Sequence, residues 1–215
     1  MIKNFYKHAD FAPGFINLMK ECNKIVLDIY KTDFETITKA DNSPLTLADQ
    51  KCNEHICNYL KKNYSDILIV SEENKRISYE ERKKHEYCFL IDPIDGTKEF
   101  IKKNGQFTIN IGLCKNGSPI FGIVSIPVTG EIYYGQEPSS YKIDSNNVTK
   151  QLLPRKDKFN KNETGLKIVA SSSHINDDTQ SFIDQFYSPS IVNVGSSIKL
   201  LRIAENKADI YPRLA

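Results

Sequence analysis

An apolar segment that ends abruptly in two carboxylates constrains the fold of this chain more than any other feature. The run Tyr87–Ile91 is long enough for a buried strand, and Asp92 and Asp95 follow it, three positions apart. Pro93 cannot donate a hydrogen bond to a strand ladder, and Gly96 permits a tight turn. We therefore expect both carboxylates on a loop at the carboxyl end of a strand, where α/β sheets usually bind ligands.

The proximity of these two acids favours a bound cation. Like charges at one point repel each other unless a cation lies between them, and Mg²⁺ binds one or two carboxylates together with water and phosphate oxygens. The alternative interpretation is a solvated Asp-Gly turn. The strand before the acids and the Thr after Gly96 favour the metal site.

The composition is that of an ordinary globular protein. Charged residues make up 26% and hydrophobic residues 40% of the 215, which excludes wholesale disorder. The formal net charge of +2 is too small to indicate a surface that binds a nucleic acid polymer. No apolar run approaches the length of a transmembrane segment, and the N-terminus lacks a signal-peptide core. We therefore expect a cytoplasmic protein.

The hydrophobic periodicity predicts an α/β fold of layered helices and sheet in two parts. Apolar spacings of three and four predict a helix over residues 13–31, and Thr46-x-x-Asp49 opens a second helix. Strands are predicted over residues 67–70, 106–114, 119–126, 131–135 and 141–144. Beyond a polar, aperiodic stretch, the second part has predicted strands over 166–170, 191–194 and 209–213 and helices over 176–187 and 196–206.

That polar stretch, residues 145–164, is the candidate linker between two domains. The first predicted domain, residues 1–148, is an α+β unit with the metal site. The second, residues 149–215, is an α/β unit that contributes substrate contacts. The alternation of elements within it is typical of layered α/β folds.

Acidic residues in three segments are predicted to meet. Asp49 lies at a helix start, Glu72 follows a short strand, and Asp92 and Asp95 follow the next strand. If these strands are neighbours, their ends bring the last three acids together, and the helix start packs alongside. Each acid alone has a plainer explanation, since Asp49 can close a capping box with Thr46 and Glu72 can be a solvated strand end.

Other acidic motifs fit this segment less well. Phosphatases with a covalent aspartate nucleophile carry Asp-x-Asp-Gly-Thr after a strand, whereas the spacing here, Asp-x-x-Asp-Gly-Thr, is one residue longer. Calcium-binding loops place their acids at every second position, which this segment does not. The sequence also lacks Gly-x-x-x-x-Gly-Lys-Ser/Thr, so nucleoside triphosphate hydrolysis has no support.

The chain resembles the inositol monophosphatase superfamily, and within it the 3′(2′),5′-bisphosphate nucleotidase branch. Asp-Pro-Ile-Asp-Gly-Thr marks the superfamily, and the Lys-Glu-Phe-Ile and Tyr-Pro-Arg segments favour the nucleotidase branch. The matching segments lie within residues 39–49, 71–73, 92–110, 195–199 and 208–213. The resemblance implies an αβαβα sandwich.

The resemblance also implies a metal centre with two or more Mg²⁺ ions. Its implied ligands are Glu72, Asp92, the carbonyl of Ile94, and Asp95. Asp92 would bridge two ions. Thr97 and Glu72 would orient and deprotonate the attacking water, and Asp49 would support Thr97.

Substrate contacts are implied in both halves of the chain. The backbone amides of Gly96 and Thr97, at a helix start, would hold the phosphate. Four residues match positions that contact the nucleotide: His174, Ser196, Lys199 and Arg213. The alternatives are a helix N-cap for Ser196, a solvated Lys199, a surface ion pair for Arg213 and a plain loop residue for His174.

One departure from the family pattern lies at the C-terminal end. The family carries a further metal-binding aspartate in a Trp-Asp-x-Ala motif, whereas this sequence ends at Ala215 and contains no Trp. The expectation is a truncated second half, a weakly held second metal and very low turnover by the 215-residue form. An extension containing the motif is expected to restore turnover.

The predicted activity is that of a Mg²⁺-dependent, lithium-sensitive phosphomonoesterase. Its expected substrate is the 3′-phosphate of adenosine 3′,5′-bisphosphate, in the context of sulfur assimilation. Phosphate ester hydrolysis demands charge neutralisation and in-line positioning, which a pair of metal ions supplies. The alternatives are an inositol-phosphate or sugar-phosphate phosphatase and a truncated, non-catalytic form that binds nucleotide or metal. The sequence leaves the oligomeric state open.

Overall fold

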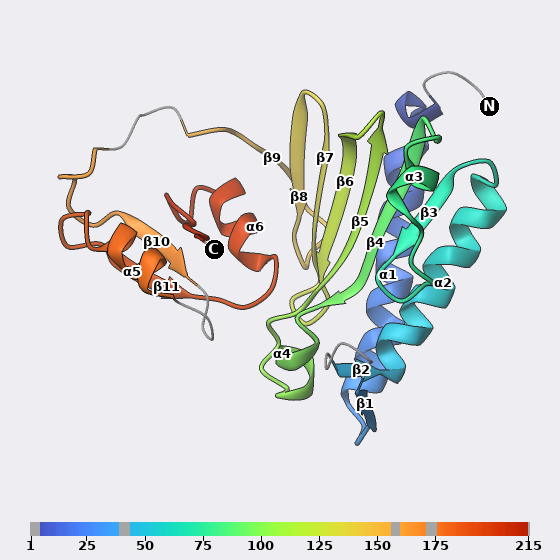
Figure 1. The fold of residues 1–215 in the computed structure, drawn as a ribbon, viewed down its shortest axis with the longest axis horizontal. Helices are drawn as coiled ribbons and strands as arrows, with labels where there is room; N and C mark the ends of the chain where they lie inside the picture. The colour runs from blue at the N-terminus through green and yellow to red at the C-terminus, as the bar shows by residue number, and fades with distance from the viewer. Residues whose placement is uncertain (1–4, 39–43, 156–159, 171–175, 215) are drawn as a thin grey trace. The chain divides into compact units, whose positions relative to one another are not determined.

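The computed structural model describes residues 5–38, 44–155, 160–170 and 176–214. The chain forms two compact units, residues 1–151 and residues 152–215 (Figure 1). The first unit contains nearly all of the large sheet and the segments with the four acids. In the described residues, no helix is both long and apolar enough to cross a membrane.

Two long helices form one layer of the first unit. Helix α1 spans Phe11–Tyr30 and buries an apolar stripe with helical spacing. Helix α2 spans Leu47–Asn63, and its start is fixed by a capping box. The amide and the hydroxyl of Thr46 both donate to Asp49 Oδ2, at 2.8 and 2.6 Å. Both helices lie along the same face of the sheet (Figure 1).

The second layer is a seven-stranded sheet with the order β3-β4-β5-β6-β7-β8-β9. Strands β3 and β4 are parallel, and each pair from β4 to β8 is antiparallel. The strands are β3 (Leu68–Ser71), β4 (Tyr87–Asp95), β5 (Thr108–Lys115), β6 (Ser118–Ile126), β7 (Glu131–Gln136), β8 (Ser139–Ile143) and β9 (Thr149–Leu152).

Short elements surround the two layers. A small antiparallel pair, β1 (Thr36–Thr38) and β2 (Pro44–Thr46), precedes α2. The short helices are η1 (Phe5–Lys7), α3 (Tyr79–Arg82) and α4 (Thr97–Ile101). Helix α4 begins at Thr97, two residues after Asp95, the last residue of β4.

The main core lies between the helix layer and the sheet. Alternate residues of β4, Phe89 and Ile91 among them, point into it, as expected for a strand with one buried face. Phe15 of α1 is fully buried at its centre. Its ring lies 5.2 Å from that of Phe121 and 4.9 Å from that of Phe11, between ring centroids. These contacts bind the helices to the sheet that carries the acids.

The second unit is a small β-α-β-α arrangement with its own core. Strands β10 (Lys167–Ala170) and β11 (Ser190–Asn193) are parallel, and the helices are α5 (Asp177–Ile183) and α6 (Ile198–Ala204). A right-handed crossover through a helix is the usual connection between parallel strands. The core contains Leu166, Ile168, Ile183 and Phe186.

The predicted α/β fold is confirmed, and two predictions of elements were wrong. Strand β9 lies within the stretch predicted as a linker. Its residues are mostly exposed and show no apolar alternation, so the hydrophobic pattern did not predict a strand there. Residues 209–213 were predicted as a strand, but they form only one bridge, from Ile210 to Ile168. Pro212 lacks the amide hydrogen that a continued ladder requires.

Candidate metal centre

The two acids of the central motif lie on strand β4 and not on a loop after it, so that prediction was wrong. The ladder between β4 and β5 pairs Asp92 with Asn110 and Asp95 with Thr108. Three steps along β4 therefore correspond to two steps along β5, which is a β-bulge. Pro93 lies within the bulge, where its missing amide hydrogen breaks no regular ladder bond. The strand continues past the proline because the bulge absorbs it.

The bulge brings both carboxylates to the same face of the sheet. In a regular strand, residues three apart point to opposite faces. Their partners Asn110 and Thr108 are two apart and share a face, and Asn110 Nδ2 donates to Thr108 Oγ1 at 3.1 Å. Asp92 and Asp95 share the face of their partners. The extra residue in the motif therefore makes the two acids converge.

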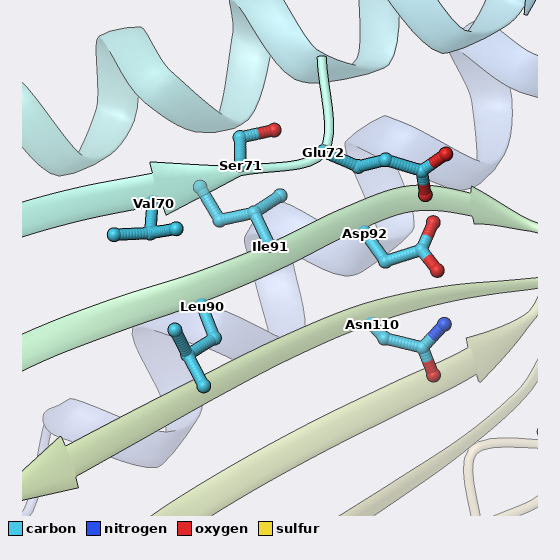
Figure 2. A pocket seen from close by; sticks show the side chains of 7 residues that line it. All are labelled: Val70, Ser71, Glu72, Leu90, Ile91, Asp92 and Asn110. Carbon is cyan, nitrogen blue, oxygen red and sulfur yellow. The ribbon is translucent and has the colours of Figure 1, made fainter. Parts of the chain in front are cut away.

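The third acid reaches the site from the neighbouring strand. Strands β3 and β4 run parallel with Ser71 beside Ile91, and the amide of Glu72 donates to the carbonyl of Ile91 at 3.1 Å. Figure 2 shows the carboxylates of Glu72 and Asp92 pointing toward each other. The predicted condition, that the two strands are neighbours, is met.

Glu72 and Asp92 line a shallow pocket of about 320 Å³ at the ends of β3, β4 and β5. Its lining combines apolar strand residues with these two acids and an amide (Figure 2). The lining residues are Val70, Ser71, Glu72, Leu90, Ile91, Asp92 and Asn110. Sequence reasoning did not assign Asn110 to the site; the only signal for it is its place opposite Asp92 in the ladder.

The electrostatics of Asp92 are those of a site that lacks a positive charge. Burial, together with the nearby charges of Glu72 and Asp95, raises the pKa of Asp92 to about 8. Among the described residues, Asp92 Oδ1 is the one buried side-chain oxygen or nitrogen without a hydrogen-bond partner. A buried carboxylate oxygen in this situation requires a proton or a cation.

The residues present fit Mg²⁺. Carboxylate oxygens from Glu72 and Asp92 are hard ligands, and Mg²⁺ typically uses one or two carboxylates and fills the remaining positions with water and substrate. Among the described His, Cys, Asp and Glu side chains, no group of three is already arranged around one point. The charge of Asp95 acts on Asp92, so the two carboxylates are near each other, and the role of Asp95 as a metal ligand stays a prediction.

Asp49 and Thr97 contact each other next to the end of β4. Asp49 is buried at the start of α2, and its Oδ1 accepts a long hydrogen bond of 3.5 Å from Thr97 Oγ1. The same hydroxyl lies 3.2 Å from the carbonyl oxygen of Ile94. Asp49 therefore closes the capping box and also contacts Thr97. The two interpretations of this residue are compatible, and its role in catalysis stays a prediction.

The turn between β4 and α4 requires glycine. Gly96 has φ of 94°, in the left-handed region that other residues rarely adopt. It precedes the five-residue helix α4, whose first residue is Thr97. The phosphate contact predicted for the amides of Gly96 and Thr97 stays a prediction.

Two of the residues predicted to contact the nucleotide, Ser196 and Lys199, are joined by a hydrogen bond within the second unit. Lys199 is 6% exposed, and its Nζ donates to the carbonyls of Ser196, at 2.7 Å, and Val194, at 3.3 Å. Ser196 has φ of 58° and precedes Ser197, the N-cap residue of α6. The alternatives of a solvated Lys199 and an N-cap at Ser196 were therefore wrong.

The other two predicted contacts differ in what the structure says of them. Arg213 is exposed, and its Nη1 lies 3.5 Å from the hydroxyl oxygen of Tyr211. His174 lies outside the described residues. Nucleotide contacts by all four residues of the second unit stay predictions.

Known proteins share both the sequence pattern and the fold. The inositol monophosphatase family matches residues 8–215. The 3′(2′),5′-bisphosphate nucleotidase CysQ of Escherichia coli O6:H1 is 34% identical over 198 residues, which are 91% of this chain and 77% of the relative. The enzyme of the same name from Haemophilus influenzae is 31% identical over 199 residues, 90% of this chain and 71% of the relative.

A solved structure agrees with these relatives. The crystal structure of CysQ from Bacteroides thetaiotaomicron, described as a bacterial member of the inositol monophosphatase family, has a TM-score of 0.80 to this chain. It is 33% identical, and the match covers 99% of this chain and 82% of that one. The fold and the site define a layered α/β protein with an acidic centre suited to a divalent cation. The chain belongs to the inositol monophosphatase family.

Proposed function

We propose that this chain is a Mg²⁺-dependent phosphomonoesterase that removes the 3′-phosphate of adenosine 3′,5′-bisphosphate. The observation that carries the proposal is the facing pair of Glu72 and Asp92, with one buried oxygen of Asp92 left without a partner. The relatives named 3′(2′),5′-bisphosphate nucleotidase support the choice of substrate.

Hydrolysis of a phosphate ester requires neutralisation of the phosphate charge and a nucleophile aligned with the leaving oxygen. Mg²⁺, when bound, supplies the positive charge that stabilises the attacking and leaving oxygens. In this proposal Glu72, an exposed residue directly after β3, accepts the proton of the attacking water. Thr97 orients that water by accepting a hydrogen bond at its hydroxyl oxygen, while the hydroxyl proton is donated to Asp49 or to the Ile94 carbonyl.

The test of the proposal is a phosphate-release screen with the purified protein in Mg²⁺. We expect adenosine 3′,5′-bisphosphate to be hydrolysed with a higher kcat/KM than inositol phosphates or sugar phosphates. A preference for inositol phosphate would move the assignment to the alternative phosphatase. Nucleotide binding without turnover would identify a non-catalytic form.

Activity is expected to require the divalent ion. The paired carboxylates repel each other without a cation, so excess chelator should abolish phosphate release and added Mg²⁺ should restore it. Li⁺ should inhibit turnover, as the family resemblance implies. Full activity in excess chelator would contradict the proposed site. A stable phosphoenzyme on Asp92 would instead support the covalent-nucleophile class.

Substitution of Arg213 is expected to separate binding from chemistry. If Arg213 contacts the part of the nucleotide away from the reacting phosphate, Arg213→Ala should raise the KM for the bisphosphate about tenfold or more and change kcat little. Hydrolysis of a small phosphate ester should change much less. Arg82→Ala, which removes an exposed arginine of α3, is the matched control. Equal losses on both substrates would show that Arg213 is structural.

A further inference from the structure

A polar network, buried at Asn53 and Ser71, joins the turn that carries Glu72 to helix α2. The hydroxyl of Ser71 donates to Asn53 Oδ1 at 2.6 Å. Asn53 Nδ2 donates to Asn74 Oδ1 at 3.0 Å. One amide side chain of α2 therefore holds the residue before Glu72 and the residue two positions after it.

Further contacts close this network around the turn. The amide of Glu73 donates to Ser71 Oγ at 3.3 Å, and the amide of Asn74 donates to the Ser71 carbonyl at 3.3 Å. Asn74 Nδ2 also lies 3.6 Å from the sulfur of Cys57, one helical turn beyond Asn53. Asn53 is 8% exposed and Ser71 is 8% exposed. These are buried groups whose hydrogen bonds are expensive to lose.

One face of α2 supports both sides of the candidate metal centre. Asp49 and Asn53 are four residues apart, so they lie above one another on the same face of the helix. Asp49 contacts Thr97, next to the end of β4, while Asn53 contacts Ser71, at the end of β3. The helix thus fixes the two strand ends relative to each other.

We propose that Asn53 is a positioning residue that holds Glu72 opposite Asp92. This inference rests on the proposed function of Glu72 as a metal ligand and base. The need for such a support follows from charge, because the two facing carboxylates repel each other whenever both are ionised, and the exposed one would then turn away. Glu72 is exposed and lies on a turn, so its backbone must be restrained from the buried side.

The test compares two buried asparagines of equal exposure. Asn53→Leu keeps the size of the side chain and removes its hydrogen bonds with Ser71, Asn74 and the Cys57 thiol. Asn23→Leu is the matched control, since Asn23 of α1 is also 8% exposed and accepts a hydrogen bond from the hydroxyl of Ser125 on β6. Each variant leaves one buried serine hydroxyl without its acceptor. Both are expected to lower stability, which thermal unfolding measures.

Only the Asn53 variant is expected to affect the metal. Mn²⁺ serves as the probe, and its binding to the metal-free protein is followed by electron paramagnetic resonance. Asn53→Leu should raise the Kd for Mn²⁺ about tenfold or more, the range found when groups that orient metal ligands are removed. Asn23→Leu should leave the Kd within about twofold of the parent. Equal Kd values for the parent and the Asn53 variant would overturn the inference.

A second variant keeps the test decisive if Asn53→Leu does not fold. Ser71→Ala removes the hydroxyl that Asn53 holds, with a small change of volume, and should raise the Kd for Mn²⁺ in the same direction. If both residues act through one network, the double variant should be no worse than the poorer single variant. Additive effects would argue against a shared role.

The Mn²⁺ measurement is also independent of catalysis. If the parent binds Mn²⁺ and the Asn53 variant binds it more weakly, but no phosphate ester is hydrolysed, then the proposed function fails and the positioning role stands. If the parent binds no Mn²⁺, both fail together.

Discussion

Asp92→Asn is expected to abolish phosphate release while the protein stays folded. The substitution removes the charge of the carboxylate that faces Glu72, and with it the electrostatic pull on the metal ion. Loss of a metal-supported clamp on the reacting oxygens is worth several kcal/mol, so kcat should fall by about 10³ or more. Steady-state kinetics in saturating Mg²⁺ and far-UV circular dichroism measure the two effects.

The same variant is expected to be more stable than the parent when metal is absent. Burial raises the pKa of Asp92 to about 8, so between about pH 4 and 8 the folded protein holds a proton that the unfolded chain releases. The stability of the metal-free parent should therefore fall as the pH rises through this window. Asn at position 92 cannot lose a proton, so Asp92→Asn should show a flatter pH dependence and a higher Tm at pH 8.

The control for both effects is Asp66→Asn, which changes an exposed aspartate in the segment before β3. It should keep the parent's activity, its pH dependence and its stabilisation by Mg²⁺. If Asp92→Asn retains substantial turnover, or is destabilised at pH 8 in chelator, then the unpaired buried oxygen of Asp92 is not a cation ligand and the proposed metal site is wrong.

Phe15→Ala is expected to cause the largest loss of stability among single substitutions in the first unit. The ring is fully buried between α1 and the sheet, against the rings of Phe11, Phe89 and Phe121. Truncation of such a residue typically lowers the free energy of unfolding by about 3–5 kcal/mol, because transfer and cavity terms add. Domains of this size have only about 5–15 kcal/mol in total. Urea unfolding at 25 °C measures the change.

Tyr79→Ala provides the comparison, since this aromatic side chain on α3 is 68% exposed. Its removal should change the free energy of unfolding by no more than about 0.5 kcal/mol. A loss below about 1 kcal/mol for Phe15→Ala would show that the helix layer contributes less to the stability of the sheet than its packing indicates.

The sequence predicted the elements whose signals are local. Apolar periodicity located α1, α2 and strands β3 to β8, because each has one buried face that repeats at the spacing of its element. It did not predict the short strands β1 and β2. The capping box at Thr46 was equally readable, since its two partners are three residues apart. The facing of Glu72 and Asp92 followed once β3 and β4 were assumed to be neighbours.

What the sequence could not predict depends on contacts between distant segments. The proline in β4 suggested a loop, and only the pairing with β5 reveals a bulge that keeps the strand intact. Lysine is usually exposed, so the burial of Lys199 on two carbonyls had no local signal. The contact of Asn53 with Ser71, 18 residues away, likewise depends on where α2 packs.

The position of β3 has a consequence for how the protein loses its site. Within the described sheet, β3 is an outermost strand of four residues that pairs only with β4. Outer segments with few hydrogen bonds open locally at lower free energy than the centre of a sheet, and amide hydrogen exchange detects such opening. Detachment of β3 would carry Glu72 away from Asp92 while the remaining strands stay paired. The fraction of folded molecules therefore sets only an upper limit on the fraction that is ready to bind metal.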